Sequence, residues 1–139
     1  MKIKTVKQYQ CDFCGKKNYS AAAMNKHEKN CTMNPDRECR MCKLREDSQT
    51  PLSELVAILP KMEIVDDNYG GVRVLNAEEI ETAMKAVREK ADNCPTCILA
   101  TIRQKGVYVS ITGFDYKKEC KEFWNNYNES QRQEDYHVW

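Results

Sequence analysis

Residues 11–31 read CDFCGKKNYSAAAMNKHEKNC, and the spacing of four of them decides how the N-terminal part of the chain folds. Two residues separate Cys11 from Cys14, so one tight turn can direct both sulfurs toward the same ion. Three residues separate His27 from Cys31, and this i, i+4 spacing puts them on one face of a helix. We therefore predict a zinc site formed by a short hairpin and the helix that follows it.

This layout, Cys-x2-Cys-x12-His-x3-Cys, resembles the C2H2-type zinc finger in its Cys-Cys-His-Cys variant. The resemblance covers residues 9–31, where Tyr9 and Met24 match the aromatic and apolar core positions of that family. The family's middle aromatic falls one residue before Tyr19, so either the hairpin is shifted by a residue or Phe13 fills the gap. The resemblance implies a ββα unit that needs zinc, since so short a segment cannot bury enough surface to fold alone.

A second set of cysteines consists of two further Cys-x2-Cys pairs, Cys39 with Cys42 and Cys94 with Cys97. Together they can close a second, four-cysteine zinc site, although the 51 residues between the pairs exceed the roughly 15–20 of common zinc ribbons. The alternatives are partial or absent ligand roles, and a thiol redox role for Cys94 and Cys97. A Cys-Pro-x-Cys pair that opens a helix has its thiolate stabilised by the helix dipole. This pair follows a helix and not a strand, which favours metal.

The rest of the chain predicts an α+β protein that is mainly helical. Apolar residues at helical spacing, with capping signals at Thr50, Asn76 and Asp115, predict helices over 51–59, 77–91, 95–105 and 115–128. Turn residues within 61–75 predict a short hairpin. The sequence VYVSITG predicts a strand over residues 107–113. We divide the chain into a zinc finger, residues 1–34, and a helical zinc-stapled domain, residues 35–139, or treat both as a single compact unit.

The composition excludes several classes of protein. Charged residues make up 31% of the chain, and no apolar run approaches the length of a membrane span. The basic start, MKIKTVKQYQ, lacks the apolar stretch of a signal peptide, so we expect a cytoplasmic protein whose cysteines are reduced. We find no glycine-rich phosphate loop, no HExxH helix and no catalytic Ser/His/Asp arrangement. We therefore expect a binding protein and not an enzyme, without a membrane or small-molecule partner.

The charge distribution indicates what the finger contacts. Residues 1–45 hold eleven Lys/Arg against four Asp/Glu, whereas residues 46–139 hold eleven against seventeen. In DNA-reading fingers the base contacts come from helix positions that here fall on Ser20, Ala23 and Lys26, and only Lys26 can make a strong one. We therefore expect non-specific or shape-based contact with nucleic acid, through the phosphate-binding residues Lys2, Lys4, Lys7, Lys16, Lys17, Lys26 and Lys29. The aromatic residues among them can stack on unpaired bases.

The main alternative is a protein-interaction module that acts as an adaptor or an inhibitor of another macromolecule. In that case the acidic body carries the contact, or the aromatic tail that contains Tyr136, Val138 and Trp139. The third hypothesis is a thiol redox protein that uses Cys94 and Cys97.

Overall fold

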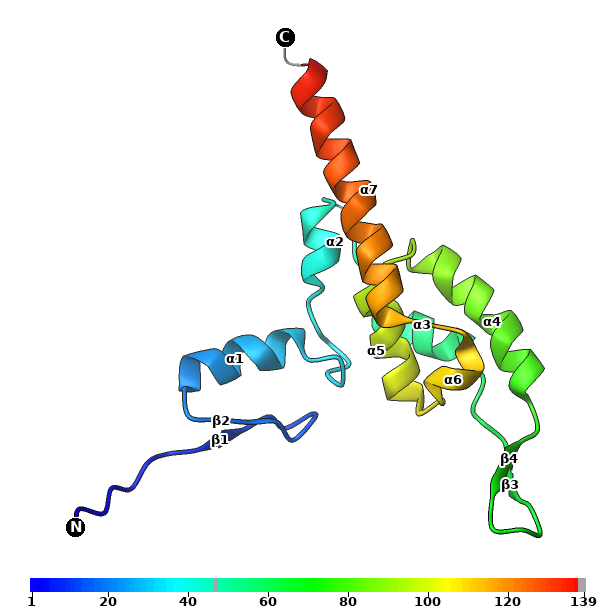
Figure 1. Cartoon of the computed structure of the whole chain (residues 1–139), viewed down its shortest axis with the longest axis horizontal. Helices are drawn as coiled ribbons and strands as arrows, with labels where there is room; N and C mark the ends of the chain where they lie inside the picture. The colour runs from blue at the N-terminus through cyan, green and yellow to red at the C-terminus, as the bar shows by residue number, and fades with distance from the viewer. Residues whose placement is uncertain (47, 138–139) are drawn as a thin grey trace.

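The computed structural model describes residues 1–46 and 48–137, and these form an N-terminal module followed by a larger helical body (Figure 1). The first eight residues extend away from the module (Figure 1). The N-terminal module contains strands β1 (Tyr9–Gln10) and β2 (Lys17–Asn18) and helix α1 (Ala21–Asn30). The two strands are antiparallel, with Tyr9 opposite Asn18. A short helix, α2 (Arg40–Leu44), lies in the segment that leads to the body.

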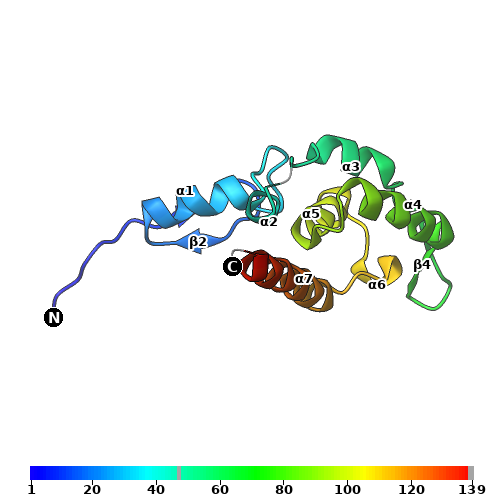
Figure 2. The ribbon, with the colours of Figure 1, turned by 90° about the horizontal axis from the view of Figure 1, so that it is seen from above.

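The helical body is built around helix α5. Its elements in chain order are α3 (Leu52–Ile58), β3 (Ile64–Asp66), β4 (Val72–Val74), α4 (Ala77–Lys90), α5 (Pro95–Lys105), α6 (Val109–Thr112) and α7 (Tyr116–His137). Helix α5 contacts α3 and α7, while α4 contacts α3 and α6 (Figure 2). The apolar stripes predicted from helical spacing meet in one core, which includes the fully buried Leu55, Leu59, Ile80, Val87, Ile98 and Ile102. The predicted α+β class is confirmed. No helix in the described ranges is long and apolar enough to cross a membrane.

The prediction of a strand over residues 107–113 is wrong, because the short helix α6 occupies this segment. The hydroxyl of Thr112 donates to the carbonyl of Val109 at 2.6 Å and accepts the backbone N–H of Phe114 at 3.3 Å. Gly113 then ends the helix with a φ of 67°, a left-handed conformation that suits glycine. Packing against α4 and these local bonds outweigh the strand preference of the β-branched residues.

Two predicted helix caps also differ from the structure. Asn76 does precede α4, but its side chain makes no capping bond. Its amide instead donates to the carbonyl of Lys61 at 2.8 Å, and its oxygen accepts the N–H of Glu63 at 2.9 Å. The hydroxyl of Thr50, which we predicted to cap the helix over 51–59, donates to the carbonyl of Lys90 at 2.8 Å. Both side chains join separate segments instead of capping their own helix.

Helix α7 is longer than predicted, since it continues to His137 and not only to residue 128. The predicted cap is present, because the carboxylate of Asp115 accepts the N–H of Lys118 at 3.3 Å. Of its apolar face, Phe123 is buried. Val138 and Trp139, which belong to the predicted aromatic tail, lie outside the described residues.

Candidate metal centres and a basic groove

The first candidate centre is the Cys/His cluster, which consists of Cys11, Cys14, His27 and Cys31. Its four ligand atoms lie within 4.8 Å of one another, and Nε2 of His27 is 3.2 Å from Sγ of Cys14. The turn between the strands holds the first pair. The N–H of Cys11 donates to the carbonyl of Lys16 at 2.8 Å, and the N–H of Gly15 donates to that of Cys11 at 3.0 Å. Gly15 has a φ of 78°, which a glycine adopts without strain.

Helix α1 brings the second pair of this cluster into place. The hydroxyl of Ser20 accepts the N–H of Ala23 at 3.3 Å and caps the helix, which begins at the next residue. His27 is therefore the seventh helical residue, as the spacing predicted, while Ser20 is occupied as a cap. Met24 is buried inside the module, and Lys26 is exposed.

The small apolar cluster of the module differs from our expectation. We expected Tyr19 or Phe13 to fill its third core position. Both are exposed, with 67% of Tyr19 and 41% of Phe13 accessible. Tyr9 and Met33 pack instead against the buried cluster of Cys11, Met24 and Cys31. Met33, which follows the last cysteine of this cluster, thus replaces an aromatic residue from the hairpin. The side chains of Phe13 and Tyr19 remain on the surface.

The second candidate centre is the four-cysteine cluster, which consists of Cys39, Cys42, Cys94 and Cys97. Sγ of Cys39 lies 3.4 Å from that of Cys94, and Sγ of Cys42 lies 3.7 Å from that of Cys97. All four sulfurs lie within 4.8 Å of one another, and all four residues are buried. The 51 residues between the pairs are therefore spanned by the fold.

Short helices and one tight turn present these four cysteines. Cys39 and Cys94 directly precede α2 and α5, and their partners lie in the first turn of each helix. The turn before α5 contains Asp92 and Asn93, with φ values of 52° and 55°. Asp and Asn tolerate this left-handed conformation better than most residues with a side chain. The sequence ADNCP thus turns the chain sharply at the place where the second Cys-x2-Cys pair begins.

The electrostatics of both clusters favour a bound cation. Hydrogen bonds with Cys42, Cys94 and Cys97 lower the pKa of Cys39. Hydrogen bonds with Cys39, Cys42 and Cys94 raise the pKa of Cys97, so the first thiolate of the cluster opposes ionisation of the next thiol. In the Cys/His cluster, burial raises the pKa of Cys31 to about 11. A divalent ion removes this conflict because it stabilises all the thiolates together.

A buried arginine shows independently that the four-cysteine cluster suits the thiolate state. Arg37 is only 4% exposed, and its Nη1 lies 4.0 Å from Sγ of Cys97. No carboxylate among the described residues is in an ion pair with it. A buried guanidinium without a negative neighbour is costly, and thiolates would supply that charge. Four sulfurs with an adjacent cation therefore fit a soft divalent metal such as zinc.

A groove of about 560 Å³ lies beside the Cys/His cluster, where the N-terminal module meets the body. We call it the basic groove. Lys26 from α1, Arg40 from α2 and Arg103 from α5 line it, and no Asp or Glu is among its described lining residues. Nη1 of Arg103 donates to the hydroxyl of Thr32 at 2.9 Å, so a neutral partner holds this guanidinium. Its positive charge therefore remains uncompensated by that contact.

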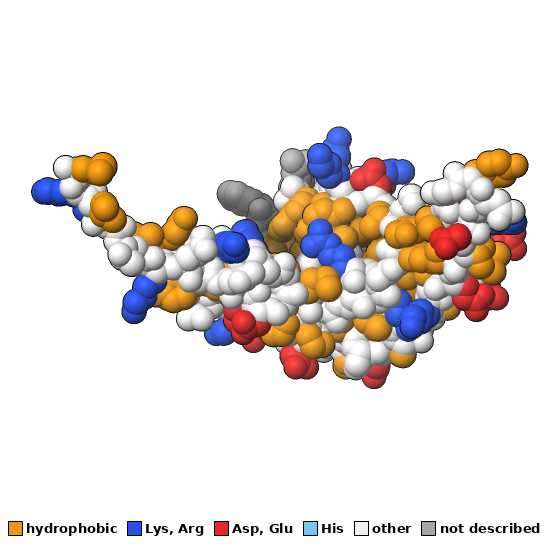
Figure 3. Space-filling view, turned by 90° about the horizontal axis from the view of Figure 1, so that it is seen from below, with side chains coloured by type: hydrophobic (Ala, Val, Ile, Leu, Met, Phe, Trp, Pro, Cys, Tyr) orange, Lys and Arg blue, Asp and Glu red, His pale blue; other side chains and the backbone are white. Residues whose placement is uncertain are grey.

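The structure brings only one of the seven predicted phosphate-binding lysines into this groove, namely Lys26. The other six are exposed on the N-terminal segment, on the hairpin and on α1: Lys2, Lys4, Lys7, Lys16, Lys17 and Lys29. Figure 3 shows Lys and Arg side chains on the N-terminal arm and over the middle of the molecule, with several Asp and Glu side chains toward the opposite end. Arg40 and Arg103 were not predicted, since no local pattern relates them to the finger.

A larger cleft of about 910 Å³ lies between α2, α4 and α7, but its charges are of both signs. Arg88 forms an ion pair with Glu119 there, and Nη1 of Arg45 donates to the carbonyl of Asp92 at 2.9 Å. Arg45 also lies over the ring of Phe123, 5.0 Å from its centroid. These contacts make the cleft part of the packing of α7, whereas the basic groove keeps a positive charge.

Comparisons of the chain with protein-family models, with curated proteins and with solved structures found no match.

Proposed function

We propose that this protein holds two structural zinc ions and binds nucleic acid non-specifically, as an accessory or regulatory protein and not as an enzyme. The first ion is held by a Cys-Cys-His-Cys zinc finger through Cys11, Cys14, His27 and Cys31. The second is held by Cys39, Cys42, Cys94 and Cys97. Each set offers four protein ligands, as structural zinc sites do, and leaves no open position for a reacting water.

The basic groove is the observation that carries the nucleic-acid proposal. Three cations from three different elements converge on it, and none of them is in an ion pair with a described residue. A nucleic-acid backbone offers a regular row of phosphates, and each contact with Lys or Arg releases condensed counterions. The planar guanidinium groups of Arg40 and Arg103 match phosphate oxygens in pairs.

The hairpin of the module favours single strands. Phe13 and Tyr19 are exposed there, so packing around the zinc does not account for them. Lys16 and Lys17 lie between these two aromatic residues in the sequence and are exposed as well. Aromatic side chains interleaved with cations are typical of surfaces that stack unpaired bases and neutralise the adjacent phosphates.

Fluorescence anisotropy with a labelled single-stranded oligonucleotide and a labelled duplex, over a range of salt concentrations, tests this proposal. The logarithm of the affinity should fall linearly with the logarithm of the salt concentration. The R40Q/R103Q variant should lower the slope by about 0.7 to 0.9 for each arginine. The matched control is K43Q, since Lys43 lies on the same helix as Arg40 but is paired with Glu38 at 3.4 Å. An affinity that does not depend on salt would overturn the proposal.

The burial of Cys94 and Cys97 does not favour the redox alternative. Their exposed fractions are 0% and 2%, whereas thiol exchange needs a sulfur that a partner can reach.

A protein partner is the second candidate, and the β3–β4 hairpin favours it. This two-stranded sheet exposes several large apolar side chains, namely Ile64, Val65, Tyr69, Val72 and Leu75. Exposed apolar strands can pair with a strand of another chain. If the hairpin binds a protein partner, the V72K/L75K variant should leave nucleic-acid binding unchanged. Sedimentation of the unaltered chain shows whether a second copy of this chain is that partner. Loss of nucleic-acid binding in this variant would remove the candidate.

A further inference from the structure

We propose that Arg37 is a positioning residue that couples the two metal centres. It supplies the counter-charge of the four-cysteine centre and joins that centre to the end of helix α1. The inference rests on the zinc sites proposed above and adds that the two ions are not held independently.

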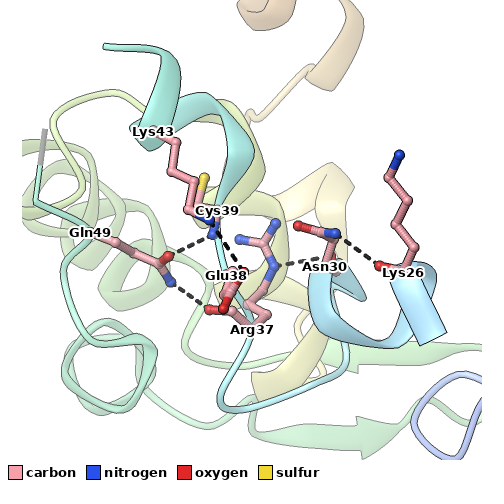
Figure 4. Close-up of polar contacts among 7 residues, drawn as sticks. All are labelled: Lys26, Asn30, Arg37, Glu38, Cys39, Lys43 and Gln49. Carbon is pink, nitrogen blue, oxygen red and sulfur yellow. Dashed lines mark hydrogen bonds and ion pairs between the residues drawn. The ribbon is translucent and has the colours of Figure 1, made fainter. Parts of the chain in front are cut away.

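The guanidinium of Arg37 lies between the two centres. Its Nε donates to the carbonyl of Asn30 at 3.3 Å, in the last turn of α1 and next to the ligand Cys31. Its Nη1 lies 4.0 Å from Sγ of Cys97, which belongs to the other centre. Figure 4 shows the side chain between Asn30 and Cys39. One buried side chain therefore contacts the helix that carries half of one centre and a ligand of the other.

The backbone around Arg37 is fixed from both sides. Glu38 donates its N–H to the carbonyl of Lys29 in α1 at 2.8 Å. The amide of Gln49 donates to the carbonyl of Arg37 at 2.8 Å, and its oxygen accepts the N–H of the ligand Cys39 at 2.6 Å (Figure 4). Through these hydrogen bonds, residues 37–39 connect the end of α1 to Cys39, the first ligand of the four-cysteine centre. A shift at either centre is transmitted to this segment.

The positive charge of Arg37 compensates the negative charge of the four-cysteine centre. Four thiolates around one divalent ion leave excess negative charge in a buried site, and an adjacent cation reduces its cost. Hydrogen bonds to ligand sulfurs also hold the thiolates in place around the metal. Since no described carboxylate pairs with Arg37, the thiolates are the negative groups to which it responds.

The first test measures zinc release from R37M with a chromogenic chelator. Removing an outer partner of metal ligands lowers metal affinity by about 10- to 100-fold, so release from the four-cysteine centre should quicken by a similar factor. The matched control is R103M, because Arg103 also binds the segment that leaves the module, and its hydrogen bond is to Thr32 and not to a ligand. R103M should release zinc at the rate of the unaltered protein. Equal rates in R37M and R103M would overturn the proposal.

The second test measures the coupling itself. The C11A/C14A variant empties the finger, and the zinc left in the four-cysteine centre should then be released faster than in the unaltered protein. The same substitutions in an R37M background should add no further acceleration, because the link is already cut. Additive effects would show that Arg37 does not carry the coupling, and an unchanged release rate in C11A/C14A would show that the two centres are independent; either result would overturn the inference.

R37K keeps the inference testable if R37M does not fold. Lysine keeps the charge near Cys97 but cannot reach Cys97 and Asn30 with a forked group. In R37K, zinc release from the four-cysteine centre should stay within a few-fold of the unaltered protein, while its response to an empty finger should be lost. Cobalt substitution reports the ligand set of each centre by its absorption bands, which a loss of stability alone would not shift. If the unaltered protein contains no zinc, the proposed function fails; if it contains two and R37K retains full coupling, only this inference fails.

Discussion

Sγ of Cys39 lies 3.4 Å from Sγ of Cys94, although the two residues are 55 positions apart in the sequence. The chain between them contains α3, the β3–β4 hairpin and α4. An ion shared by these cysteines would close that whole segment into one loop. Closing a loop of this length removes much conformational freedom from the unfolded chain, so the metal would stabilise the body as well as its own site.

Loss of one ligand from this centre should remove one ion and destabilise the body. We expect two zinc ions in the purified protein and one in C94S, measured by mass spectrometry of the metal. A ligand present at a thousand times its dissociation constant stabilises the folded state by about 4 kcal/mol, so C94S should lose at least that much. The C120S variant is the control, because Cys120 belongs to neither cluster. Equal zinc content in C94S and C120S would contradict the four-cysteine site.

The spacing of residues was enough to predict both candidate ligand sets. The pairs of Cys-x2-Cys, and of His27 with Cys31, depend on one turn or one helix, whose geometry is local. The same holds for the cap at Asp115 and for the long helix α4. Local sequence preference gave the wrong prediction for residues 107–113. They have the composition of a strand and yet contain the helix α6, which packs against α4.

The features that were missed depend on contacts between distant parts of the chain. Arg37 lies 60 residues from Cys97, and Arg103 lies 71 from Thr32, so no periodicity connects them. A buried arginine looks the same in the sequence as the exposed Arg40 three positions later. The basic groove could therefore be recognised only after α5 was placed against the end of the module.

Asn76 provides a test of this long-range organisation. Its amide bridges Lys61 and Glu63 at the start of the hairpin, and the side chain is buried. N76A would remove two hydrogen bonds, one to the carbonyl of Lys61 and one from the N–H of Glu63. At about 0.5–1.5 kcal/mol for each bond, it should lower the free energy of unfolding by about 1–3 kcal/mol in urea with zinc present. N68A, in the exposed loop of the same hairpin, should change it by less than about 0.5 kcal/mol. An equal effect of both would contradict the bridging role of Asn76.

Tyr19 tests base stacking separately from charge. Because it is largely exposed, Y19A should leave the thermal midpoint of unfolding unchanged. If the ring stacks on a base, the variant should bind a single-stranded oligonucleotide more weakly by about 1–3 kcal/mol, with the same salt dependence. Y69A removes another exposed tyrosine, from the β3–β4 hairpin, and should bind normally. A loss of the same size in both variants would assign the effect to something other than stacking by the finger.

The N-terminal segment gives the last prediction. Lys2, Lys4 and Lys7 are exposed on an arm that extends away from the module (Figure 1). If all three neutralise phosphates of a single strand, the K2Q/K4Q/K7Q variant should reduce the magnitude of the salt slope by about 2, since each contact contributes about 0.7. The arm keeps its length in this variant, so a change in slope reports charge and not the loss of a segment. The stability of the protein should not change, because these side chains lie outside both apolar clusters. An unchanged slope would restrict the contact to the groove and the hairpin, and would remove the arm from the proposed interface.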